Sequence, residues 1–190
     1  MLRVKIGVMG SAAEAATPGV GELARALGKT IAARDVILLT GATTGLVNLV
    51  GKTAHEAGAF HVGISPGENQ REHTETFGLP LDACDAMIYT GFGLKGRNVV
   101  LVRSCDVVIF IAGSIGSLNE FTIAHDEGKI IGCLTGTGGT ADEIASLAAT
   151  FKKPTRSRIL HETDPARLID KCLQAFKELS PRDFPVNKQG

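Results

Sequence analysis

The sequence predicts a Rossmann-like α/β fold: a doubly wound parallel sheet in a three-layer α/β/α arrangement. Short runs rich in Val, Ile and Leu alternate with longer segments of helical composition, the order expected of repeated βα units. The runs are apolar throughout and do not alternate with polar residues, so helices should cover both faces of the sheet. Most runs end in glycine, which suits a sharp turn from strand to helix.

The expected strands follow one another at residues 4–10, 36–41, 60–66, 86–91, 106–113 and 129–136. The expected helices lie near residues 19–34, 45–58, 94–105, 117–128, 140–151 and 164–179. In the last helix Asp164 can act as N-cap, and Pro165 fits the first helical position. The polar stretch 67–85 has no clear period and is expected to be a long surface loop, a kind of segment that is often functional.

Length and composition favour one domain over residues 1–180, followed by a C-terminal tail at 181–190. Twenty basic and twenty acidic residues leave no net charge, and no basic block is long enough to bind nucleic acid, so we expect no such partner. The N-terminus lacks a signal-peptide pattern, and no apolar run approaches the roughly 20 residues of a membrane span. We therefore expect a cytoplasmic protein without a membrane partner.

The four cysteines are far apart, with no CxxC pair and no histidine at ligand spacing. This spacing indicates neither a metal site nor a disulfide framework, and we expect buried thiols.

Glycine-rich turns follow four of the expected strands, at residues 7–11, 41–45, 113–117 and 136–140. In doubly wound sheets, ligands bind beyond the carboxyl ends of the strands. One such turn is weak evidence of a site, because any sharp turn favours glycine. Four turns at one edge of the sheet favour a ligand site there.

Two familiar nucleotide-binding motifs are disfavoured. The segment GLVNLVGKT, residues 45–53, has Leu46 where a Walker A loop needs glycine, and its Lys52 would lie inside a helix. The first turn, GVMGSA, does not match GxGxxG, and no acidic residue closes the second strand. A P-loop NTPase and a dinucleotide oxidoreductase are therefore not expected.

A carboxylate follows the third glycine turn, in the segment FIAGSIGSLNE at residues 110–120. The amides of 114–118 lie where strand passes into helix and can bind phosphate, and Ser114 and Ser117 can add hydroxyl donors. If the helix starts at Gly116 and Ser117, Glu120 falls in its first turn and can cap it. Alternatively, a bound phosphate leaves its sugar near Glu120, whose carboxylate could stabilise a sugar cation or orient water.

The segment AGSIGSLNE, residues 112–120, resembles the PGGxGTxxE signature of the Lonely Guy (LOG) family, whose characterised members release cytokinin-type bases from nucleoside monophosphates. Residues 38–66 are similar to the family's GGxxGLM segment and the helix and strand that follow it. Arg97 stands 23 residues before Glu120, as in the family. The resemblance covers roughly residues 4–136 and implies a phosphoribohydrolase with Arg97 and Glu120 as its catalytic pair.

The departures from this pattern resemble another branch of the same superfamily. Ala112, Ser114 and Ser117 replace the signature Pro, second Gly and Thr, and Asn98 stands where the hydrolases commonly have Lys. Arg97-Asn98 and the GVMGSA and TGFG turns look like the molybdenum-cofactor carriers, which bind a pterin phosphate. Two hypotheses remain open: a binder of a phosphorylated nucleotide or pterin cofactor, and a nucleoside 5′-monophosphate phosphoribohydrolase that releases a purine base.

In either case the expected ligand is AMP-like or of the molybdopterin type, and catalysis needs no cofactor. The expected ligand-binding residues are Gly10, Ser11, Gly41, Ala42, Thr44, Gly45, Arg97, Asn98, Gly113, Ser114, Ile115, Gly116 and Ser117. Residues 98–102, NVVLV, could form a strand because they are β-branched, but the resemblance makes them helical. An apolar helix of this kind can be a pairing surface, and we expect a homodimer or a larger even-numbered assembly.

Overall fold

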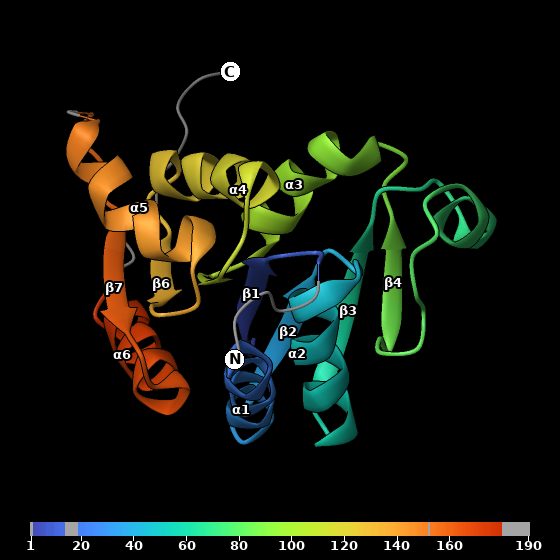
Figure 1. Ribbon diagram of the computed structural model, residues 1–190, viewed down its shortest axis with the longest axis horizontal. Helices are drawn as coiled ribbons and strands as arrows, with labels where there is room; N and C mark the ends of the chain where they lie inside the picture. Colours follow the sequence, from blue (N-terminus) through green and yellow to red (C-terminus); the bar gives the residue numbers. More distant parts are fainter. Residues whose placement is uncertain (1, 14–18, 152, 180–190) are drawn as a thin grey trace.

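A seven-stranded parallel sheet forms the centre of the protein, in a computed structural model that describes residues 2–13, 19–151 and 153–179 (Figure 1). The strands lie in the order β4-β3-β2-β1-β5-β6-β7, and each neighbouring pair is parallel. They span Val4–Gly10 (β1), Val36–Thr40 (β2), Phe60–Ser65 (β3), Ala86–Tyr89 (β4), Val107–Ile111 (β5), Ile130–Leu134 (β6) and Arg158–Glu162 (β7).

Helices cover both faces of this sheet. They span Val20–Ala32 (α1), Gly45–Glu56 (α2), Gly93–Ser104 (α3), Ile115–Asp126 (α4), Gly139–Thr150 (α5) and Pro165–Lys177 (α6). One cluster of buried apolar side chains joins α1, α2 and α6 to the sheet, and a second joins α3, α4 and α5 to the opposite face (Figure 1). The predicted three-layer α/β/α fold is confirmed.

Burial explains why the strands are apolar throughout. Every residue of β5 and of β6 is buried, because helices pack on both of their faces. The segment 98–102 is helical, as the resemblance implies, and its Asn98, Leu101 and Val102 are buried in the protomer. Much of its apolar character therefore belongs to the protomer's own core.

Helix α6 begins as predicted. Asp164 is its N-cap and accepts a hydrogen bond from the Arg167 amide at 2.8 Å, and Pro165 takes the first helical position.

Two elements were not predicted. Strand β7 lies at an edge of the sheet, and its charged ends and half-buried middle make its sequence, RILHE, a weaker strand pattern than those of the interior. The expected loop 67–85 contains a short π-helix, Glu72–Thr76 (η1). Its His73 is fully buried: Nδ1 pairs with the Ser65 hydroxyl at 2.8 Å, and Nε2 donates to the Pro80 carbonyl at 3.0 Å. His73 therefore anchors this segment to the end of β3.

The chain enters the sheet at its centre. From β1 it builds one side as β2 to β4, and then the other side as β5 to β7. The loops after β1 and β5 diverge and leave a crevice at the carboxyl ends of these strands. Both strands approach closely there, since a Cβ on Gly10 would lie 2.2 Å from the Ile111 carbonyl oxygen. Gly10 is thus required by strand packing.

The tail expected at 181–190 lies outside the described residues. In the part of the chain that is described, no helix combines the length and the apolar character needed to cross a bilayer. All four cysteines are unpaired; three are buried, and Cys84 is half-buried.

Candidate functional site

A cavity of about 170 Å³ lies at the crevice, between the ends of the central strands and the first turns of α3 and α4. Four parts of the chain line it: β1 with the turn after it, the turn after β2 with α2, α3, and the turn after β5 with α4. The lining residues are Val8, Met9, Gly10, Ala12, Gly41, Thr43, Val47, Leu94, Lys95, Arg97, Asn98, Ser114, Gly116, Ser117 and Glu120. The glycine turns after β2 and β5 thus meet the pair Arg97 and Glu120 at one cavity.

Arg97 is a buried cation with few partners. Its side chain comes from α3 and is 4% exposed, and its Nη1 donates to the Ile64 carbonyl at 3.3 Å. Its Nε has no hydrogen-bond partner. A buried guanidinium normally uses its five donors, so a buried Nε without a partner beside a cavity marks Arg97 as a candidate functional residue.

Glu120 lies in the second turn of α4, six residues after the N-cap Ser114. The alternative that Glu120 caps α4 from its first turn is therefore wrong, because the helix starts at Ile115, two residues before Ser117. Glu120 is 7% exposed, and burial raises its pKa to about 7, although the charges of Arg97 and Lys95 oppose this shift.

No salt bridge joins Arg97 and Glu120, so the pair acts across the cavity by charge alone. The amide of Asn98 lies beside the carboxyl of Glu120. In one of the two orientations of its amide, Asn98 donates to Glu120 Oε1 at 3.2 Å and to the Leu94 carbonyl at 3.1 Å. A neutral amide therefore stands beside Glu120, where a cation would lower its pKa.

Lys95 is a site residue that sequence reasoning missed. It lies in the first turn of α3, exposed at the cavity, and its Nζ is 4.0 Å from where a Cβ on Gly116 would be. A cation at a helix N-terminus is unfavourable unless an anion is near. Only the unusual place of this lysine in the GLKGR turn could have revealed it, because no motif includes it.

Two alanines in the turns beside the cavity have left-handed backbones. Ala42, after β2, has φ 48°, and Ala112, after β5, has φ 50°; among the described residues they are the only ones other than glycine with positive φ. Such strain costs on the order of 1 kcal/mol and is concentrated at functional sites. Hydrogen bonds hold both: the Ala42 amide donates to Thr40 Oγ1 at 3.1 Å, and the Ala112 amide to Thr137 Oγ1 at 2.8 Å.

Several predicted ligand-binding residues have another task in the structure. The Leu46 amide donates to the Ser11 carbonyl at 3.0 Å, and the Thr44 hydroxyl donates to the Ala12 carbonyl at 2.7 Å. Gly45 has φ 69°, and a Cβ there would lie 2.3 Å from Ala12. The loop after β1 is therefore joined to the start of α2 by Ser11, Thr44 and Gly45. The first amides of α2 already donate to this loop and are not free for a ligand.

The turn after β5 is supported in a similar way. The Ser117 hydroxyl donates to the Gly10 carbonyl at 3.1 Å, so it ties α4 to β1 and is not a free donor. Gly113 accepts from the Thr140 amide at 3.1 Å, and thus the fourth glycine turn, 136–140, supports the third. The α4 N-terminus itself has no side-chain cap, which leaves its amides for a ligand.

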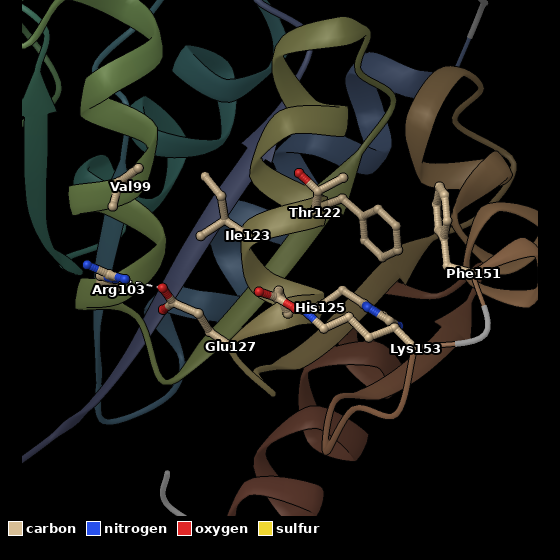
Figure 2. Close-up of a pocket in the computed structure, with 10 residues that line it drawn as sticks. Val99, Arg103, Thr122, Ile123, His125, Glu127, Phe151 and Lys153 are labelled. Carbon is tan, nitrogen blue, oxygen red and sulfur yellow. Dashed lines mark hydrogen bonds and ion pairs between the residues drawn. The ribbon is translucent and has the colours of Figure 1, made fainter. Parts of the chain in front are cut away.

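A second, larger cavity of about 500 Å³ lies on the outer side of α3 and α4 (Figure 2). Its charged side chains are paired, Arg103 with Glu127 at 2.6 Å and Lys153 with Asp126. None of the predicted site residues lines it. The smaller cavity is therefore the candidate site.

Comparisons with known proteins agree with this architecture. The family model described as the SLOG cluster4 family matches residues 3–169. An uncharacterized protein of Archaeoglobus fulgidus is 31% identical over 134 residues, which cover 70% of this chain and 82% of that protein.

Two solved structures resemble nearly the whole chain. The Moco carrier protein of Chlamydomonas reinhardtii is 28% identical, with a TM-score of 0.74, and the match covers 94% of this chain and 100% of that one. The molybdenum cofactor binding protein of Rippkaea orientalis is 28% identical, with a TM-score of 0.69, over 93% and 97%. The predicted resemblance to the LOG and cofactor-carrier superfamily is thus confirmed, and the chain belongs to the SLOG cluster4 family.

Proposed function

We propose that this protein binds a phosphorylated small molecule, a nucleotide or a pterin cofactor, and serves as its carrier. The observation that carries the proposal is the buried guanidinium of Arg97, with an unpartnered Nε, beside a cavity that also receives Lys95 and the uncapped start of α4. Two cations and a helix N-terminus together suit a phosphate group. The molybdenum-cofactor proteins, similar over nearly the full chain, support the pterin as ligand.

The size of the cavity limits what enters it. Pockets that enclose a drug-sized ligand measure roughly 300–1,000 Å³, whereas this cavity holds about 170 Å³. It suits the phosphate end of such a ligand, with the heterocycle outside.

A second candidate is the phosphoribohydrolase, which the place of Glu120 favours. A carboxyl with a pKa raised to about 7 can exchange a proton near neutral pH, and Arg97 faces the same cavity. One observation opposes the hydrolase: Ala112 has a left-handed backbone where the hydrolase signature has proline, so the backbone of this turn differs from that of the hydrolases.

Titration calorimetry with AMP and with a pterin monophosphate tests binding, and chromatography tests for free base. Gly116→Val should abolish binding, because its side chain would point into the cavity without meeting backbone. Gly21→Val is the matched control, since both glycines are the second residue of a helix. Equal ligand affinity in the folded Gly116→Val variant would move the site elsewhere.

The same samples separate the two candidates. Ligand binding without base release supports the carrier. If wild type releases base from AMP, Glu120→Gln should lower that rate by about 10²-fold, the scale of removing one electrostatic interaction from the transition state. A Glu120→Gln variant with full base release would exclude Glu120 as the catalytic carboxylate.

We also propose a homodimer or a larger even-numbered assembly. Val99 and Val100, both half-buried, are the part of the apolar segment in α3 that a second copy could cover. Light scattering at tens of micromolar measures the mass, and a monomer would contradict this assembly.

A further inference from the structure

Two exposed aliphatic side chains flank the cavity. Leu94, in the first turn of α3, is 48% exposed and lines the cavity itself. Ile115, the first residue of α4, is 73% exposed and lies between the lining residues Ser114 and Gly116.

Neither helix propensity nor core packing explains these two residues. Helix starts favour small polar residues and proline, and β-branched isoleucine gains nothing at an exposed first position. Both side chains instead leave apolar surface in water at a site otherwise built for an anion. Exposed apolar surface beside a polar site is typical of ligand binding.

The two side chains belong to the same opening. The neighbour of Leu94 is Lys95 and the neighbour of Ile115 is Gly116, and Lys95 Nζ lies 4.0 Å from the Cβ position of Gly116. The starts of α3 and α4 therefore meet at the cavity mouth, each with one aliphatic side chain.

We propose that Leu94 and Ile115 form a clamp for the planar heterocycle of the ligand, outside the cavity that holds its phosphate. This inference rests on the proposed function. With this clamp, the expected ligand is a phosphorylated compound with a purine- or pterin-like ring. The aliphatic side chains contact the flat ring, and the cations and the backbone amides bind the phosphate.

The test compares ligands with and without a ring. AMP, neopterin 3′-phosphate and ribose 5-phosphate are titrated into wild type, Leu94→Ser, Ile115→Ser and the double variant by calorimetry. Each substitution should weaken AMP and neopterin 3′-phosphate by roughly tenfold, because one face of the ring stays in water, and leave ribose 5-phosphate unchanged. Phe151→Ser, at a 51% exposed residue of the other cavity, is the control and should change none of the three.

The outcomes separate this inference from the proposed function. Ribose 5-phosphate binding together with unchanged affinity for both ring-bearing ligands in the double variant overturns the clamp and leaves the phosphate site standing. Failure of all three ligands to bind wild type overturns the proposed function and the clamp with it. A double variant that loses an oligomer by light scattering but keeps its ring affinity assigns these side chains to a subunit contact and overturns the clamp.

Discussion

The guanidinium of Arg97 lies in the space that a side chain on Gly41 would fill, since a Cβ added to Gly41 would be 1.6 Å from Nη1. Gly41 has no left-handed backbone that would itself require glycine. The glycine after β2 is therefore needed for the place of Arg97. A glycine turn that looks like a phosphate loop acts here by making room for a cation.

Gly41→Ala should displace Arg97 and lower phosphate affinity by more than tenfold, because the buried cation can no longer reach its place beside β3. The variant should still fold, as alanine suits this backbone. Calorimetry with AMP and a thermal melt measure both effects, with Gly21→Ala, which would meet only side-chain atoms at 3.5 Å or more, as control. Unchanged AMP affinity would mean that Arg97 does not hold the phosphate.

Glu120→Gln should stabilise the protein at alkaline pH. Burial raises the pKa of Glu120 from 4.5 to about 7, so between these values the folded state keeps a proton that the unfolded state has released. The contribution of Glu120 is thus fully present below pH 4.5 and is lost as pH rises to about 7, by up to about 3 kcal/mol.

Gln has the same shape and never ionises, so it avoids this loss. Urea unfolding at pH 8 should show the variant more stable than wild type, and the two should converge near pH 4. Equal stability at pH 8 would show that Glu120 is hydrated as an ordinary surface carboxylate.

Phosphate affinity should depend on the same proton. A phosphate in the cavity repels the Glu120 carboxylate, so binding favours the protonated form, and affinity should fall by up to tenfold per pH unit above about 7. The phosphate ionises near pH 6 itself, so the measured quantity is the ratio of wild-type to Glu120→Gln affinity for AMP between pH 6 and 8.5. Parallel profiles for the two proteins would place the phosphate away from Glu120.

The sequence predicted the layers of the fold and the principal charged pair of the cavity. Apolar runs identify interior strands because both faces of these strands are buried. The 23-residue spacing of Arg97 and Glu120 brings the two side chains to one site because each lies on a helix beside the same crevice. Strand β7 was not predicted because its short sequence, RILHE, has charged ends and only two apolar residues.

The remaining parts of the site depend on three-dimensional contacts that spacing does not reveal. Lys95 faces the cavity only because α3 and α4 start side by side. Gly45 resembles a glycine of a phosphate-binding loop, yet in the structure it leaves room for the loop after β1, which approaches it closely at Ala12. Glu120 looks like a first-turn carboxylate until the start of α4 is fixed at Ile115.

His61 should oppose Glu120 in the pH dependence of stability. It is buried and neutral: Nδ1 donates to the Ala83 carbonyl, and Nε2 accepts from the Thr40 hydroxyl at 2.8 Å, which in turn holds the Ala42 amide. Burial lowers its pKa from 6.5 to about 4, so its contribution is present above pH 6.5 and is lost as pH falls through 4, by up to about 3 kcal/mol.

The two contributions have opposite sign and nearly the same pH range. Wild type should therefore have almost constant stability between pH 4.5 and 6.5, whereas Glu120→Gln should lose stability as the solution becomes more acidic. Adding His61→Gln to that variant should flatten the profile again. Asp85 adds no slope in this range: although burial opposes the shift, its bonds to the His61 amide and to His55 lower its pKa from 3.8, so its contribution is lost only below about pH 4. Urea midpoints across this range measure it, and a flat Glu120→Gln profile would contradict a neutral buried His61.

Ala112 stands where the LOG signature has proline. Its φ of 50° is closed to proline, whose ring fixes φ near −65°, and its amide donates to Thr137 Oγ1 at 2.8 Å, a bond that proline lacks. Ala112→Pro should therefore cost about 3 kcal/mol or more, while Ala112→Gly, which relieves the left-handed strain, should change stability by less than about 1 kcal/mol. Urea unfolding of both variants measures the difference. If Ala112→Pro keeps wild-type stability, the turn can adopt the backbone of the hydrolases, and the main structural objection to base release disappears. If Ala112→Pro unfolds while Ala112→Gly does not, the backbone of this turn differs from that of the hydrolases and depends on a hydrogen bond that the signature proline excludes.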